Sequence, residues 1–79
     1  MRLDKWLKVS RLIKRRTVAQ EACDGGRVSV NGVVAKPSRD VKVGDTIEVS
    51  FGSKTLRAEI LSVQETVRKD DAAAMYKEL

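Results

Sequence analysis

The sequence predicts an α+β protein in which two N-terminal helices precede a small antiparallel sheet of hairpins and a short C-terminal helix. Three observations lead to this class. Apolar residues recur at helical spacing in residues 2–24, they alternate with polar ones in residues 28–30, 46–51 and 55–60, and glycine-containing turns separate the segments. The 79 residues suffice for one small core, and a chain of this size buries only about 60–65% of its unfolded surface.

Residues 2–13 are expected to form one helix, or two short helices with a bend. Leu3, Trp6 and Leu7 fall on one face of such a helix at positions i, i+3 and i+4, and residues 9–13 repeat this spacing one step further round. Because Trp6 lies between two core leucines, we assign it to the core rather than to stacking on a nucleic-acid base.

A second helix is expected over residues 16–24, where small apolar side chains recur every four residues. Small side chains on this stripe allow another helix to approach closely. Gly25 and Gly26 follow, and glycine readily takes the left-handed conformation in which many helices end. Cys23 lies on the apolar stripe, and we interpret it as a small buried hydrophobe rather than a reactive thiol.

Two hairpins are expected next. Asn31-Gly32 separates two valine-containing runs, and this dipeptide favours a two-residue hairpin because both positions tolerate a positive φ. Residues 46–51 and 55–60 alternate apolar with polar side chains on either side of a turn at Gly52-Ser53, so they should pair as antiparallel strands with one buried face.

The tail is expected to contain a short helix. Ala72, Met75, Tyr76 and Leu79 follow the helical spacing i, i+3, i+4 and i+7, and Asp70 is the candidate N-cap.

The positive charge is concentrated at one end of the chain. The net charge is +5, yet residues 1–16 hold seven basic side chains and one acidic one, which leaves nine basic and ten acidic residues elsewhere. A cationic edge on a near-neutral body indicates a polyanionic partner, because phosphates relieve the repulsion among clustered cations. A simple solvated helix face is the alternative. The basic residues of this edge are Arg2, Lys5, Lys8, Arg11, Lys14, Arg15 and Arg16.

The composition argues against catalysis, metal binding and membrane insertion. One cysteine and no histidine exclude the usual zinc sites and remove the commonest acid–base group. We find no phosphate-binding loop or nucleophile motif, and we assign no catalytic residue, metal ligand or cofactor. No apolar run approaches the roughly 20 residues that cross a bilayer. Polar residues interrupt every apolar stretch after the basic N-terminus, so we expect no signal peptide and a cytoplasmic location.

Four separated stretches, residues 2–7, 24–28, 30–32 and 41–49, resemble in order and spacing the alpha-L RNA-binding motif, the domain named for small-subunit ribosomal protein S-four. The resemblance covers roughly residues 1–50. We expect the RNA-binding domain to span residues 1–62 and residues 63–79 to form an extension with a short helix. Residues 12–17 and the tail around Met75 are similar to a narrower group, the RqcP-type ribosome quality control proteins, which are related to a small ribosome-associated heat-shock protein.

The resemblance implies a non-catalytic factor that binds rRNA and peptidyl-tRNA on stalled large ribosomal subunits and supports alanine tailing by a partner factor. A monomer is expected. On matching positions, Arg2 and Arg16 are the leading RNA contacts. Many relatives carry Ser or Thr where Arg15 stands, which would be a normal N-cap; Arg15 cannot cap in this way, so its charge is available to RNA.

Four further residues complete the candidate site. Asp4 either pairs with Lys8 at i+4 and orients the neighbouring cations, or interacts only with the helix dipole. Arg27, Lys36 and Arg39 flank the hairpins and either widen the RNA surface or are ordinary surface charges. The strands offer no exposed aromatic pair, so recognition by shape and phosphate geometry is favoured over base reading.

Three other functions stay open at this stage. A recycling factor of the heat-shock type would share the RNA chemistry but differ in its partners. An RNA-binding module could act in trans with an RNA-modifying enzyme or a tRNA synthetase. In a plain protein-interaction domain, RNA and salt would be irrelevant.

Overall fold

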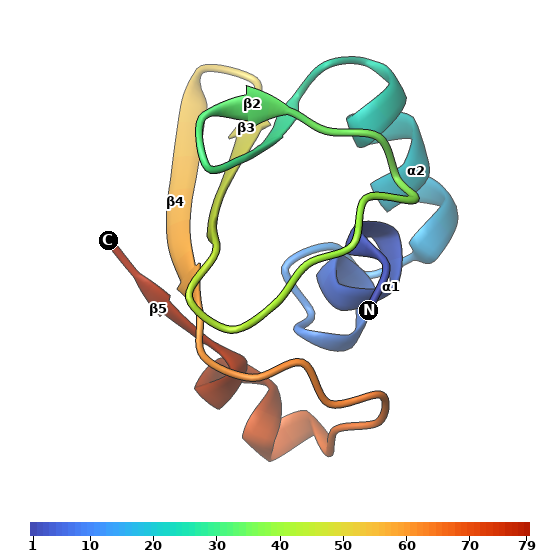
Figure 1. Cartoon of the computed structure of the whole chain (residues 1–79). Coiled ribbons are helices and arrows are strands. Elements are labelled where there is room, and N and C mark those ends of the chain that lie inside the picture. The colour runs from blue at the N-terminus through green and yellow to red at the C-terminus, as the bar shows by residue number, and fades with distance from the viewer.

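Two short helices cover one face of a five-stranded antiparallel sheet in the computed structural model, which describes all 79 residues (Figure 1). The predicted α+β class is confirmed. The strand order across the sheet is β2-β1-β3-β4-β5. The elements are α1 (Leu3–Val9), α2 (Arg16–Asp24), β1 (Val28–Val30), β2 (Val33–Val34), β3 (Thr46–Phe51), β4 (Lys54–Ile60), the 3-10 helix η1 (Lys69–Met75) and β5 (Tyr76–Glu78).

The core lies between the sheet and the helices. Trp6 and Leu7 of α1 are fully buried there, and Val30 and Ile47 reach the same core from the sheet. The core position predicted for Trp6 is therefore confirmed, and its indole Nε1 donates a hydrogen bond to the carbonyl oxygen of Ser62 at 2.9 Å. This bond satisfies the one polar atom that the buried ring carries.

The first helix is shorter than the spacing in residues 2–13 predicts, because α1 ends at Val9. The Ser10 hydroxyl donates to the carbonyl oxygen of Leu7 at 3.2 Å, and the Ile13 amide donates to the same oxygen at 3.1 Å. Arg11 takes a φ of 63°, so the chain reverses within one turn. Apolar residues 12 and 13 thus reach the core from a turn and not from a helix. The spacing of apolar residues is the same in both cases, so it does not distinguish them.

The second helix has the predicted bounds, Arg16–Asp24. Arg15 precedes it in an extended conformation and makes no side-chain cap, as its chemistry requires. Cys23 is 3% exposed, which confirms its assignment as a buried residue. Burial, together with the charges of Asp4 and Asp24, raises the pKa of the Cys23 thiol to about 11, so the thiol stays protonated near neutral pH.

The two predicted hairpins are present. Asn31 and Gly32 take φ values of 51° and 83°, the left-handed pair that the dipeptide favours. β3 and β4 pair from Thr46 opposite Glu59 to Phe51 opposite Lys54. The inward side chains of β1, β3 and β4 form the sheet side of the core, and the outward face is polar.

The tail differs from the helix predicted over residues 72–79. Only Lys69–Met75 is helical, as a 3-10 helix, and Arg68 rather than Asp70 occupies its N-cap position. Tyr76–Glu78 is extended and pairs with β4 as strand β5. The physical reason is the edge of β4, whose backbone N–H and C=O groups gain partners from an adjacent extended segment. Figure 1 shows this segment running beside β4.

We predict that Met75→Ala lowers the free energy of unfolding by about 2–5 kcal/mol, because Met75 is 1% exposed within the core and truncation leaves a cavity. Urea denaturation followed by tryptophan fluorescence measures the change. Leu79→Ala removes an apolar side chain of similar size that is 58% exposed, and it should change stability by less than about 0.5 kcal/mol. Equal effects of the two substitutions would contradict a structural role for the tail.

Candidate nucleic-acid interface

The side chain of Asp4 is fully buried at the junction of α1 and α2. Its Oδ1 atom accepts hydrogen bonds from Arg2 Nε at 3.2 Å and from the Lys5 amide at 2.8 Å. Its Oδ2 atom accepts from Arg16 Nε at 3.2 Å and from Gln20 Nε2 at 2.9 Å. One carboxylate therefore connects Arg2, which precedes α1, with α1 itself and with α2.

Asp4 orients two arginines without hiding them. The side chains of Arg2 and Arg16 are 51% and 42% exposed while Asp4 is 0% exposed. A guanidinium has five N–H donors in a planar fork, and the carboxylate uses only one side of each. The remaining donors are free for a second anion such as a phosphate. The two leading RNA contacts expected from the sequence are thus held together.

Of the two alternatives for Asp4, the ion pair with Lys8 is not formed. Asp4 turns inward between the helices, where the arginines and Gln20 meet it, whereas Lys8 is exposed on the outer side of α1. Asp4 does lie in the first turn of α1, as the dipole alternative requires.

Opposing effects act on the pKa of Asp4. Burial raises this pKa, but hydrogen bonds from Gln20, Arg16 and the Lys5 amide lower it, as does the charge of Arg16. The net result is a pKa below the ordinary value of 3.8. The carboxylate is therefore ionised at neutral pH, and both arginines face a fixed negative charge.

A second group of cations surrounds a groove of about 520 Å³ between the turn after α1 and the segment that leads into η1. Lys8, Arg11 and Lys14 line one side, and Lys69 lies on the other. The sequence analysis identified the first three and missed Lys69, because only the folding of the tail brings this residue to the groove. We call the groove lined by Lys8, Arg11, Lys14 and Lys69 the cationic groove.

Glu65 lies in the cationic groove and forms an ion pair with Lys5. The hydrogen bond from Lys5 and the charge of Lys5 hold the pKa of Glu65 below its ordinary value. Without RNA, one of the predicted contacts is therefore already paired. Glu65 is an acidic residue that an incoming phosphate would have to displace.

The remaining candidates are divided between two places. Lys14, Arg15 and Arg27 line another groove beside α2, so Lys14 belongs to both grooves and joins them. Lys36 and Arg39 line neither groove and are exposed. Their loop nevertheless adjoins the start of α1, since the Leu3 amide donates to the Arg39 carbonyl oxygen at 2.8 Å.

No group of three or more histidine, cysteine or carboxylate side chains is arranged to hold a metal ion. None of the helices has both the length and the apolar character that a bilayer crossing demands.

Comparison with known proteins identifies the family. Residues 1–47 match the model of the S4 domain family. The chain is 56% identical over 77 residues to the RQC P-site tRNA stabilizing factor of Streptococcus pneumoniae, covering 98% of this chain and 88% of the relative. It is 55% identical over 76 residues to the factor of the same name from Bacillus subtilis, covering 96% and 88%.

A solved structure, the trimeric structure of Vibrio cholerae Heat Shock Protein 15, superimposes with a TM-score of 0.93 at 35% identity and covers 100% of this chain and 81% of that one. The fold and the cationic face thus define an S4-domain RNA-binding protein. Within that class, the chain belongs to the family of RQC P-site tRNA stabilizing factors, which is non-catalytic.

We predict that Asp4→Asn lowers the free energy of unfolding at pH 7 by about 1–3 kcal/mol, the cost of removing a charged hydrogen-bond acceptor from a buried site. Because folding lowers the pKa of Asp4, its contribution is present above the unfolded value of about 4 and is lost as the pH falls through the folded value. The variant should therefore lose less stability than the wild type as the pH falls below about 5. Urea denaturation across this range measures both effects.

The control is Asp24→Asn, which neutralises an exposed carboxylate at the end of α2 and should change stability by less than about 0.5 kcal/mol. An Asp4→Asn variant with undiminished acid sensitivity would refute the assigned role of Asp4.

We predict that Glu65→Gln strengthens RNA binding by about 1.5- to 5-fold, the range for one exposed ion pair, because it frees Lys5 and removes a competing anion. Fluorescence anisotropy with a labelled tRNA at about 100 mM salt measures the affinity. The matched control is Glu78→Gln on β5, which makes the same charge change outside the groove. Equal gains for both variants would mean that net charge alone matters.

Proposed function

We propose that this protein binds the large ribosomal subunit through rRNA and P-site tRNA, using the cationic surface of α1 and α2, in ribosome-associated quality control. The observation that carries the proposal is the arrangement of Arg2 and Arg16 on the buried Asp4 carboxylate. It presents two partly exposed guanidinium groups in fixed orientation, a suitable arrangement for neighbouring phosphates of a folded RNA.

The role of the protein in this proposal is to hold RNA, not to change it. Arg2 and Arg16 supply directional contacts, and the lysines of the cationic groove act as point charges along the same backbone. If about five side chains each neutralise a phosphate, log K should fall against log salt with a slope of about −3.5 to −4.5. The polar outer face of the sheet carries no aromatic platform and is not part of this surface.

The name of the relatives, RQC P-site tRNA stabilizing factor, supports a tRNA partner on the ribosome. We propose the following partners in more detail. The tRNA is peptidyl-tRNA retained on a stalled large subunit, and its fixation supports alanine tailing by a partner factor. The protein acts as a monomer in the cytoplasm. The similarity to Heat Shock Protein 15 makes a recycling factor the second candidate, since that protein shares the whole fold. A pull-down separates the candidates: an alanine-tailing factor supports the first, and an RNA-modifying enzyme or synthetase would support a module acting in trans.

We predict that the double variant Arg2→Ala/Arg16→Ala loses association with large ribosomal subunits while it stays folded. Loss of two charge-assisted contacts, at about 1.5–3 kcal/mol each, corresponds to a decrease in affinity of more than 100-fold. Sucrose-gradient sedimentation of ribosomal fractions measures association, and circular dichroism checks the fold.

The matched control is Lys54→Ala/Lys77→Ala, which removes the same charge from exposed positions on β4 and β5. It should sediment with the subunits like the wild type at moderate salt. If both double variants dissociate to the same extent, binding depends on overall charge and the proposed surface is wrong.

A further inference from the structure

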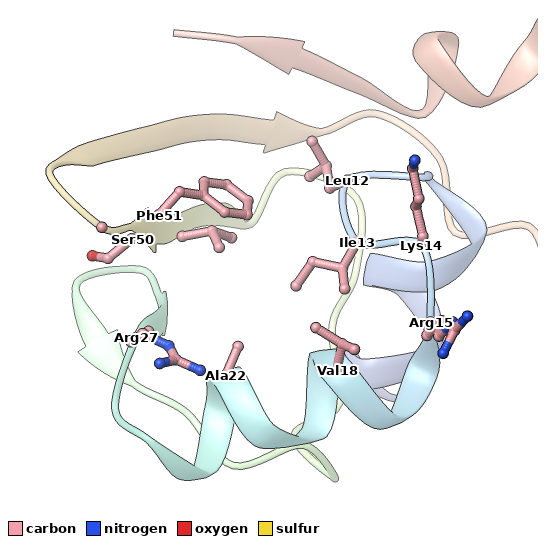
Figure 2. A pocket seen from close by; sticks show the side chains of 11 residues that line it. Leu12, Ile13, Lys14, Arg15, Val18, Ala22, Arg27, Ser50 and Phe51 are labelled. Carbon is pink, nitrogen blue, oxygen red and sulfur yellow. The ribbon is translucent and has the colours of Figure 1, made fainter.

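A mainly apolar groove of about 570 Å³ lies between α2, the turn after α1 and the β3–β4 hairpin. Figure 2 shows the Phe51 ring across this cavity from Val18 and Ala22 of α2, with Ile13 at the side between them and Leu12 beside the ring. Val18 and Phe51 are each 45% exposed although apolar. The volume lies within the range of about 300–1,000 Å³ that small-ligand sites occupy.

The rim of this groove is positive. Lys14, Arg15 and Arg27 line it, and none of its eleven lining residues is acidic. An apolar hollow bordered by cations suits a ligand that is anionic at its edge and apolar at its centre. Amphipathic protein segments with acidic residues and nucleotides both meet this description, so the groove alone does not separate them.

Its position favours the nucleotide. Lys14 lines both this groove and the cationic groove, and Arg15 is the chain neighbour of Arg16. RNA that lies on the α1–α2 surface therefore lies next to the rim of this groove. Bases in loops and bulges can leave their stack, and proteins bind such bases on aromatic side chains and between apolar groups.

We propose that this groove holds one unstacked base of the bound RNA. The base lies against the Phe51 ring and the aliphatic wall of α2, and the phosphates on either side of it contact Lys14, Arg15 and Arg27. This inference rests on the proposed function, since the RNA must already lie on the cationic surface. The site would add recognition of one base to a domain whose strands carry no exposed aromatic pair and for which the sequence favoured recognition by phosphate geometry.

The test compares two stem-loop RNAs that differ at one position: one carries a single-nucleotide adenosine bulge, and the other carries an abasic ribose there. Both have the same number of phosphates, so the affinity ratio reports the base alone. For the wild type, anisotropy titrations should give about 5- to 150-fold tighter binding of the base-bearing RNA, the range for stacking one base. The salt slopes of the two RNAs should be equal.

Three variants locate the effect. Phe51→Ala should reduce the ratio to near one, and Phe51→Leu, which keeps apolar volume without a ring, should give an intermediate ratio. Val33→Ala, an exposed apolar residue on β2 outside the groove, should keep the wild-type ratio. Amide spectra of all three check that each is folded. An undiminished ratio in Phe51→Ala would overturn the proposal.

The outcomes distinguish failure of the base site from failure of the proposed function. Equal binding of both RNAs by the wild type would overturn the base site and leave the proposed function in place. Failure to bind either RNA would overturn both. A further control is a helical peptide with one leucine face and one glutamate face. If this peptide shifts the amide resonances of Val18 and Phe51 and the bulged RNA shifts neither, the groove binds protein and the base site is wrong.

Discussion

The arrangement of this protein depends on a single buried carboxylate. Asp4 is removed from solvent and has hydrogen-bond partners in three parts of the chain: Arg2 before α1, the Lys5 amide within α1, and Arg16 with Gln20 in α2. A charge in such a place is costly unless it is paired and fully hydrogen-bonded. The two helices can therefore pack only where these donors converge, so one requirement determines both the packing of α1 on α2 and the direction of two guanidinium groups.

This coupling explains how a domain with a small core can present an oriented cationic surface. Arginine and lysine side chains lose considerable rotamer freedom when they are ordered, and a surface ion pair repays little of that loss. In this structure, Arg2 and Arg16 are ordered by a contact that also offsets the cost of burying the Asp4 charge, together with the bonds from Gln20 and the Lys5 amide. RNA then meets side chains that are already oriented, which reduces the entropic cost of binding. Lys8 and Arg11 have no such anchor among the ion pairs of the structure.

Local signals in the sequence were sufficient where one element determines the outcome. The small-residue stripe and the glycines after it gave the bounds of α2, and Asn31-Gly32 gave the first hairpin. Helical spacing predicted the wrong structure in two places. At Ile13, a turn buries residues three and four apart just as a helix would. At residues 76–78, the free edge of β4 pairs with the chain and makes it a strand. For the candidate site, the basic edge could be predicted from the charges of residues 1–16 alone. Contacts between distant segments determine three features that no local pattern encodes: the burial of Asp4, the position of Lys69 at the cationic groove and the position of Phe51 at the apolar groove.

Two acidic residues near the basic edge act in opposite ways, and the difference follows from burial. Asp4 is inaccessible, so phosphates cannot replace it; it fixes the arginines and leaves their outer donors available. Glu65 is exposed, so it behaves as a weakly held substitute for phosphate at Lys5, and RNA can displace it at little cost. Salt weakens the exposed pair more than the buried one. Added ions therefore release Lys5 from Glu65 while they also weaken the phosphate contacts, whereas the Arg2–Asp4–Arg16 geometry persists. A surface built in this way loses affinity as salt increases but keeps the orientation of its two principal contacts.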